Sequence, residues 1–284
     1  DSSTSRGLGD VYKRQRNDRL TQGQRLEVVV SAEPRSGKGA VVRRLGPGEG
    51  APRLIQKAPR VADQLRGLAP GEESVAGIAA IDAVIDAEEE ALARTHQFPT
   101  HGLDLSLERT RALIAIDIDH APTPGRDPKQ ARATANREGL NQAARLIGLR
   151  RWGGLVIVDL IGDGRDAAAQ SEAVRAAFGH EAQAVFGPVS RFGLLELSLP
   201  WRQTPLEDVL LDADGRPSLQ TRALSLVRRL RRHLLSDRAA PRIVARCTPE
   251  EAAIAAPLAE RLGPRAGVRP DAAIAAGRGH IEEI

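Results

Sequence analysis

The chain has 284 residues, which is enough for one large domain or two modest ones. Its 41 lysines and arginines outnumber its 37 aspartates and glutamates, and the net charge of +4 is compatible with a nucleic-acid partner without requiring one. The single cysteine, Cys247, excludes a disulfide framework and a thiolate zinc site. No apolar run approaches the ~20 residues of a membrane span and no stretch resembles a signal peptide, so we expect a cytoplasmic protein without a membrane partner.

The first part of the chain contains little predicted structure. Residues 1–16 are polar and patternless, and the letters VYKRQ within them look like translated adapter sequence, so we interpret them as a non-native or disordered tail. Residues 22–45 alternate between apolar and polar side chains around a turn at 34–39, which predicts a β-hairpin. Residues 49–77 hold several glycines and prolines and are predicted to form a connector with a short helix at 60–68.

A strand–helix–strand unit is the clearest pattern in the middle of the chain. Apolar runs at 112–119 and 153–161 predict buried strands, and residues 127–149 between them have the spacing of an amphipathic helix. A crossover of this kind usually sets its two strands parallel and adjacent in one sheet. We therefore expect an α/β fold here.

An aspartate lies at the end of each apolar run, Asp117 in the first and Asp159 in the second. Open α/β sheets hold their ligands at the carboxyl ends of their parallel strands. Two carboxylates a few ångströms apart repel each other unless a cation or a proton lies between them. The pair therefore predicts a metal site or an acid/base pair, and the alternative is that both aspartates only cap the loops that follow.

The other predicted elements are helices and short strands. In chain order they are helices at 78–93 and 165–178, a strand at 192–198, a helix at 221–235, a strand at 243–245 and a helix at 249–262. The helix at 221–235 contains the basic run RRLRRH, which is compatible with phosphate binding. Its leucine spacing indicates that one face packs, so a solvated basic helix is the simpler interpretation.

Four separated segments carry a resemblance to a known family. They are TRALIAIDID at 110–119, NREG at 136–139, ARLIGLRRWGGLVIVD at 144–159 and SRFGLLEL at 190–197. In order and spacing they resemble the catalytic domain of the ribonuclease E/G family. That resemblance implies a deoxyribonuclease I-like domain of a cytoplasmic endoribonuclease, which cuts single-stranded RNA with Mg²⁺, or Mn²⁺ in its place, and leaves a 5′-phosphate and a 3′-hydroxyl.

The resemblance also implies roles for individual residues. Asp117 and Asp159 match the two aspartates that hold the metal and carry catalysis. Asp119, Asn136 and Glu138 match positions around them, so we expect these side chains to shape the surroundings of the metal. Whether Asp119 interacts with a metal-bound water or is only solvated stays open. The same choice, between orienting a metal-bound water and facing solvent, stays open for Asn136 and Glu138.

The chain departs from the family pattern at several positions. Asp119 stands where the motif has an asparagine, Thr134 replaces the first asparagine of the helix motif, and Gly162 replaces an acid, with Asp163 shifted by one position. The family's cysteine-containing zinc linker between subunits has no counterpart, so we expect no zinc, and an oligomer, if one forms, without that linker. The ribonuclease H-like segment and the 5′-phosphate sensor also have no counterpart.

Weaker similarity at both ends completes the predicted division of the chain. The segments are the tail at 1–16, a partial OB-fold RNA-binding segment at 17–48, a connector at 49–77, the catalytic domain at 78–205, a connector at 206–220 and a small C-terminal α/β domain at 221–284.

Lys38 and Arg191 are the candidate RNA contacts. Lys38 lies in the hairpin turn, where a structural turn is the simpler interpretation, and the residues around it do not complete a P-loop. Arg191 precedes a predicted strand and is either a phosphate contact or one of many surface arginines. His120 follows Asp119 and is interpreted as a loop histidine rather than a general base.

These patterns together predict a metal-dependent endoribonuclease that hydrolyses single-stranded RNA in RNA processing or decay. The alternative is a non-catalytic RNA-binding or assembly subunit that retains the ribonuclease scaffold. The altered acids and an aromatic content of 2% favour it, because stacking on aromatic rings is a common grip on single strands. A third interpretation is an α/β phosphohydrolase acting on small phosphate esters.

Overall fold

The structure is a computed structural model that describes residues 20–35, 37–121, 127–162 and 167–284. The tail at 1–16 and Asp163 therefore lie outside the described residues. The chain divides into two compact units: the first comprises the described residues within 30–41 and 87–209, and the second those within 20–29, 42–86 and 210–284. No helix in the described part of the chain is long and apolar enough to cross a membrane.

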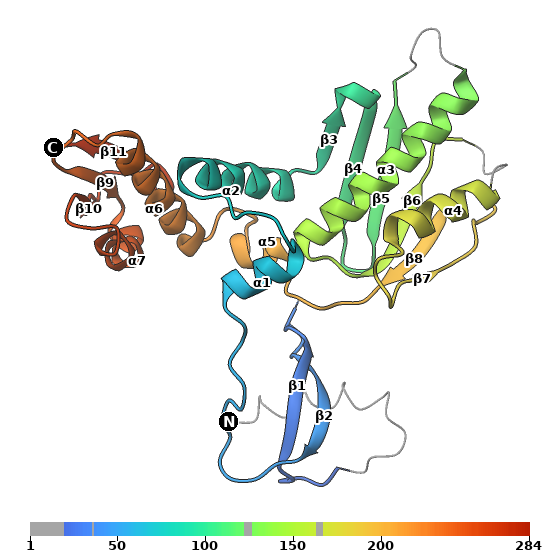
Figure 1. Ribbon diagram of the computed structural model, residues 1–284, viewed down its shortest axis with the longest axis horizontal. Helices are drawn as coiled ribbons and strands as arrows, with labels where there is room; N and C mark the ends of the chain where they lie inside the picture. The colour runs from blue at the N-terminus through green and yellow to red at the C-terminus, as the bar shows by residue number, and fades with distance from the viewer. Residues whose placement is uncertain (1–19, 36, 122–126, 163–166) are drawn as a thin grey trace. The chain divides into compact units, whose positions relative to one another are not determined.

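The first unit is built around a mixed sheet. In the described residues this sheet has six strands in the order β3-β4-β5-β6-β8-β7 (Figure 1). The strands are β3 (Thr95–Phe98), β4 (Leu103–Arg109), β5 (Ile114–His120), β6 (Gly154–Asp159), β7 (Val185–Phe186) and β8 (Leu195–Leu199). Strands β5 and β6 pair in parallel, and their neighbours pair antiparallel. The predicted strand–helix–strand unit is thus confirmed.

One face of this sheet packs against α3 (Pro128–Arg150) and α4 (Ala167–Phe178), which lie over it side by side (Figure 1). Burial alternates along the strands, because successive side chains of a strand point to opposite faces. In β5, Ile114, Ile116 and Ile118 are buried in the core under the helices. The residues between them are exposed on the opposite, open face of the sheet.

Local sequence signals explain where α3 begins and how closely it packs. Asp127 caps the helix by accepting a hydrogen bond from the Lys129 backbone N–H at 3.2 Å, and a proline follows it at the first helical position. Within the helix, a Cβ added at Gly139 would lie 2.7 Å from the Ile118 side chain. Only glycine therefore allows α3 to approach β5 this closely.

The second unit contains its own smaller α/β core. In the described residues a three-stranded sheet has the order β10-β9-β11 and packs with α6 and α7. These elements are α6 (Leu219–Ser236), β9 (Ile243–Cys247), α7 (Pro249–Glu260), β10 (Ala266–Pro270) and β11 (His280–Glu283). The predicted helices and the strand at 243–245 are confirmed. The tail of the chain, for which no strands were predicted, forms β10 and β11.

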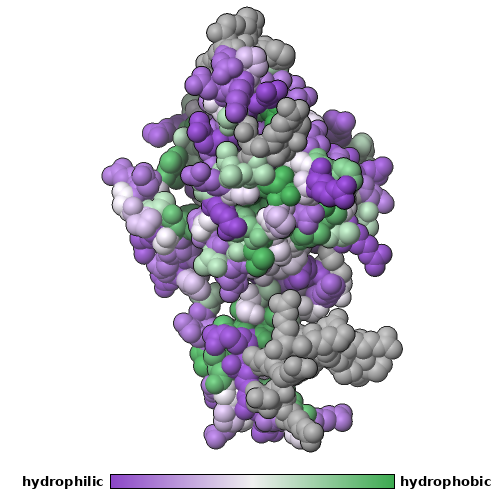
Figure 2. Space-filling model, turned by 90° about the vertical axis from the view of Figure 1, so that its right-hand side faces the viewer, coloured by the Kyte–Doolittle hydropathy of each residue, from purple (hydrophilic) through white to green (hydrophobic). Residues whose placement is uncertain are grey.

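The remaining elements are short or exposed. They are the hairpin of β1 (Leu26–Ala32) and β2 (Val41–Pro47), α1 (Val61–Leu68), α2 (Gly77–Leu92), a 3₁₀ turn η2 (Pro99–His101) and α5 (Leu206–Leu210), which lies in a segment predicted to be a connector. The predicted hairpin is confirmed, but Val28, Val30 and Leu45 within it are exposed. Figure 2 likewise shows hydrophobic and hydrophilic residues intermingled over the side that it draws.

Candidate metal centre

Asp117 and Asp159 are direct neighbours across the parallel ladder of β5 and β6. The register pairs the two Cα positions, and adjacent strands lie about 4.8 Å apart. Both residues are exposed, and Ile116 and Val158 before them are buried in the core. The two carboxylates therefore lie next to each other on the open face of the sheet.

Strand β4 adds a fourth acidic position, which the sequence did not predict. Its register sets Asp104 opposite Asp119, and Ser106 opposite Asp117. Asp104 is exposed, as the alternation of Leu103, Leu105 and Leu107 with polar residues requires. That alternation was a readable strand signal, but the partner of Asp104 is set by strand pairing between distant segments. Asp104 and Asp119 thus form a second pair, between β4 and β5, two residues further along β5 than Asp117.

The four aspartates (Asp104, Asp117, Asp119 and Asp159), here called the aspartate cluster, repel one another. Although Asp117 is exposed, partial desolvation by the atoms around its carboxyl is the largest cause that raises its pKa above the ordinary value. The other three carboxylates raise this pKa further, Asp159 most strongly, then Asp119 and Asp104. A bound cation would remove this repulsion. Carboxylate oxygens are the ligands that hard cations such as Mg²⁺ prefer, so the residues present fit a magnesium ion.

Asn136 reaches a different target from the one expected. Its side-chain amide donates to the Ile161 carbonyl at 3.0 Å and its amide oxygen accepts from the Ile161 N–H, also at 3.0 Å. Both polar groups of the side chain are therefore engaged by one backbone residue just after β6. Asn136 is buried with 8% of its surface exposed, so it does not face solvent.

The other two residues expected around the metal have local partners. Glu138 is half-buried on α3 and accepts a hydrogen bond from the Gln142 side chain at 2.9 Å. Asp119 accepts from the His120 backbone N–H at 2.7 Å and is exposed on the open face of the sheet. His120 is the last residue of β5 rather than a loop residue, so that expectation was wrong.

The two candidate RNA contacts are both exposed. Lys38 lies in the turn of the β1–β2 hairpin, where it forms an isolated bridge with Arg35. Arg191 lies in the turn before β8, beside Ser190, whose side chain accepts from the backbone N–H groups of Phe192 and Leu194. Both are exposed cationic residues, which is compatible with a phosphate contact.

A second group of possible metal ligands lies in the second unit. His233, Asp237 and Glu283 offer ligand atoms within 4.8 Å of one another. Their interactions already explain them: His233 pairs with Glu283 at 2.7 Å, and Asp237 accepts from the N–H groups of Ala239 and Ala240 at 2.7 and 3.1 Å. This group therefore closes the end of α6. Among the described residues no three carboxylates of the aspartate cluster are spaced as closely as these three ligands, so the cluster is a metal candidate through the neighbouring pair Asp117 and Asp159.

Comparisons with known proteins point to the same segment of the chain. The sequence profile described as the ribonuclease E/G family matches residues 53–201, which include the whole six-stranded sheet and the aspartate cluster. The chain is 35% identical over 114 residues to "Ribonuclease E" of Escherichia coli strain K12, an overlap that covers 39% of this chain and 11% of that protein.

Two further relatives give the same result. "Ribonuclease E" of Haemophilus influenzae is 36% identical over 115 residues, which is 39% of this chain and 12% of that protein. "Ribonuclease E" of Buchnera aphidicola is 32% identical over 112 residues, which is 38% of this chain and 12% of that protein. The match thus spans only about an eighth of these relatives. Because the family profile covers more than half of the chain, the chain belongs to the ribonuclease E/G family.

Proposed function

We propose that the chain is a metal-dependent endoribonuclease that hydrolyses single-stranded RNA, with Mg²⁺ as its cofactor and Mn²⁺ as a substitute. The observation that carries this proposal is the register of Asp117 opposite Asp159 on an open sheet face, within the segment that matches the family. Among the described residues, the charges that shift the pKa of Asp117 are all carboxylates, and this repulsion is unfavourable for the fold alone, which favours a role in ligand binding.

In this proposal each residue of the cluster has a stated part. Asp117 and Asp159 would hold the metal ion, which when bound neutralises charge on a phosphate and lowers the pKa of a water molecule. Asp119 and Asp104 add negative charge beside this pair and so attract the cation further. Water adds to phosphorus, the bond from phosphorus to the 3′ oxygen breaks, and that oxygen takes up a proton, leaving a 5′-phosphate and a 3′-hydroxyl.

RNA would be held mainly through its phosphates. Lys38 and Arg191 are proposed as contacts because both are exposed. We further propose a cytoplasmic role in RNA processing or decay; the name "Ribonuclease E" of the relatives supports cleavage of RNA. An oligomer would have to form without the family's zinc linker.

The test is cleavage of an end-labelled single-stranded RNA with and without Mg²⁺. Asp117→Asn and Asp159→Asn should each lower the rate by roughly a thousandfold, since metal binding supplies several kcal/mol to such reactions. The exposed Asp214, which lies in the second unit, supplies the matched control Asp214→Asn, and its rate should stay that of the wild type. Near wild-type turnover of either cluster variant at saturating metal would remove that residue from the site.

A non-catalytic RNA-binding subunit is the second candidate, and the extra carboxylates favour it. Asp104 and Asp119 lie beside the pair and would repel an incoming phosphate if no cation were bound. Under this function the chain would bind RNA but leave it uncut at saturating Mn²⁺, and the aspartate variants would bind RNA more tightly than the wild type.

A further inference from the structure

The side chain of Asn136 makes a two-sided contact of the kind seen between paired strands. Its amide nitrogen donates to the Ile161 carbonyl, its amide oxygen accepts from the Ile161 N–H, and both distances are 3.0 Å. One buried side chain therefore satisfies both backbone groups of one residue. Only an amide supplies a donor and an acceptor with this separation, so the contact depends on the asparagine itself.

Ile161 lies beyond the last residue of β6 that pairs with a neighbouring strand. The pairing of β6 with β5 ends at Asp159, and its pairing with β8 ends at Val158. Gly162, the next residue, has a φ of +118°, so the chain turns there. Within the described residues, the Asn136 contact therefore holds the backbone of the segment that follows Asp159.

The same helix is also tied to the strand that carries Asp117. Gly139 lies three residues after Asn136, so the two positions share one face of α3. Gly139 packs so closely on Ile118 that an added Cβ would lie 2.7 Å from it, and Ile118 directly follows Asp117. One face of α3 thus contacts the residue after Asp117 in β5 and Ile161, which lies two positions after Asp159 and beyond the end of β6.

We propose that Asn136 is a positioning residue that sets the spacing between Asp117 and Asp159 through its clamp on Ile161. It acts on the backbone and does not contact the metal. This inference rests on the proposed function, because the spacing matters only if the two carboxylates share a cation. It differs from a role in orienting a metal-bound water, since both polar groups of the amide are already engaged.

The test compares Asn136→Ala with Asn141→Ala, a matched control at an exposed asparagine on the same helix. Calorimetric titration with Mn²⁺ and no RNA measures the site directly, and hydrogen exchange measures the Ile161 amide. We expect Asn136→Ala to weaken Mn²⁺ binding by roughly 10- to 100-fold, the range seen when residues that orient metal ligands are removed. Exchange at Ile161 should speed up, exchange within β5 should stay slow, and the control should match the wild type.

The outcomes separate this inference from the proposed function. Wild-type protein that binds Mn²⁺ no better than Asp117→Asn would overturn the metal site and the clamp with it. Wild-type binding that Asn136→Ala retains in full, with faster exchange at Ile161, would overturn the clamp alone. If Asn136→Ala is unfolded at the assay temperature, Asn136→Ser decides instead, because its short hydroxyl side chain cannot span both backbone groups of Ile161. Unchanged Mn²⁺ affinity in that variant would refute the proposal.

Discussion

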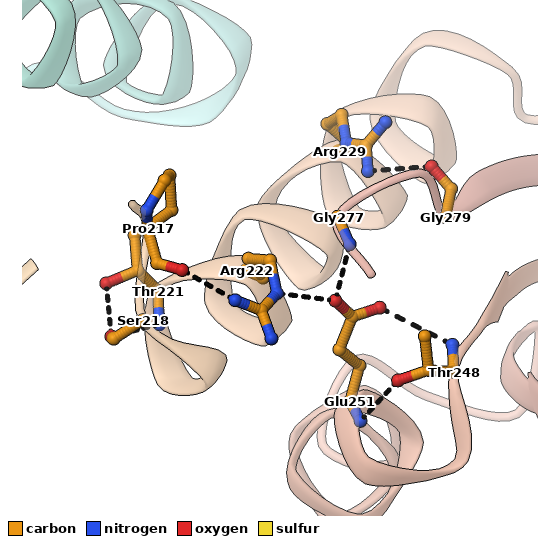
Figure 3. A network of polar contacts seen from close by, with 9 residues as sticks. All are labelled: Pro217, Ser218, Thr221, Arg222, Arg229, Thr248, Glu251, Gly277 and Gly279. Carbon is orange, nitrogen blue, oxygen red and sulfur yellow. Dashed lines mark hydrogen bonds and ion pairs between the residues drawn. The ribbon is translucent and has the colours of Figure 1, made fainter. Parts of the chain in front are cut away.

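Two groups of carboxylates in this chain lie in opposite environments. Glu251, at the start of α7, is buried, and its carboxylate meets donors from Arg222, Thr248 and Gly277 (Figure 3). It accepts from Arg222 and from the Gly277 N–H, both at 2.8 Å, and forms a capping box with Thr248. In the aspartate cluster, by contrast, each charge from the described residues that shifts the pKa of Asp117 is another carboxylate.

The difference separates a structural acid from a ligand-binding one. A buried carboxylate surrounded by donors stabilises the fold and has no free capacity for a ligand. Adjacent exposed carboxylates destabilise the fold slightly and attract a cation. A count of acidic residues therefore does not tell a structural carboxylate from a ligand-binding one. The charge of the neighbouring groups does: donors surround the structural one, and other carboxylates surround the ligand-binding one.

The largest expected effect is the loss of Glu251. Glu251→Ala leaves the mostly buried Arg222 guanidinium and the Gly277 N–H without their acceptor, so the free energy of unfolding should fall by about 3 kcal/mol. Urea denaturation followed by circular dichroism measures it. Glu260→Ala, an exposed glutamate on the same helix, is the control and should change little. Equal stability of both variants would show that the Glu251 network does not hold the second unit together.

A second expectation concerns the salt dependence of RNA binding. If Arg–phosphate contacts rather than base stacking hold the RNA, raising monovalent salt from 50 to 200 mM should weaken binding roughly tenfold or more. The cleavage rate should not depend on whether the RNA has one 5′-phosphate or three. Fluorescence anisotropy with both forms of one oligonucleotide measures this, and tight binding that ignores salt, or a preference for the monophosphate, would contradict it.

The sequence predicted the centre of the fold because its signals there are local. The alternating apolar run before Asp117, the β-branched run before Asp159 and the helix between them each follow from their own residues, and the structure confirms all three. Their parallel register follows from the general rule for crossovers. The two aspartates could therefore be placed side by side without coordinates.

The rest of the candidate site depends on contacts between distant segments. Asp104 is 15 residues before its partner Asp119, and only the register of β4 against β5 brings them together. The target of Asn136 is a backbone group 25 residues away, which no periodicity reveals. The strands β10 and β11 were missed for the same reason, since β9 holds both through pairings that their own short sequences do not signal.

A smaller effect is expected from neutralising Asp119 or Asp104, the two members of the aspartate cluster beside the pair Asp117 and Asp159. Asp119→Asn restores the residue that the family motif has at this position, and it should leave cleavage unchanged or raise it about two- to fivefold by reducing the repulsion of phosphate. Asp104→Asn tests the same charge from β4 and should act in the same direction. Initial rates at saturating Mg²⁺ measure both. Complete loss of activity in either variant would instead make that residue an obligatory ligand.

The smallest expected effect is on thermal stability. Because the pKa of Asp117 is raised in the fold, its ionised form is disfavoured there, and the wild type loses stability as pH rises through that pKa. Asp117→Asn removes this loss, so without divalent metal at pH 7 its Tm should exceed that of the wild type by about 1–3 °C.

The Tm of Asp117→Asn, measured at different pH values and with added Mg²⁺, tests whether Asp117 binds a cation. Its advantage in Tm should vanish as pH falls below about 4, the ordinary pKa of aspartate, where the wild-type carboxyl is protonated. Adding Mg²⁺ should raise the Tm of the wild type more than that of Asp117→Asn, since the ion binds only the folded site. Glu196→Gln, an exposed acid on β8 outside the cluster, should show neither change. If Asp117→Asn instead melts below the wild type at pH 7 without metal, Asp117 stabilises the fold like Glu251, and the contrast between the two groups of acids is wrong.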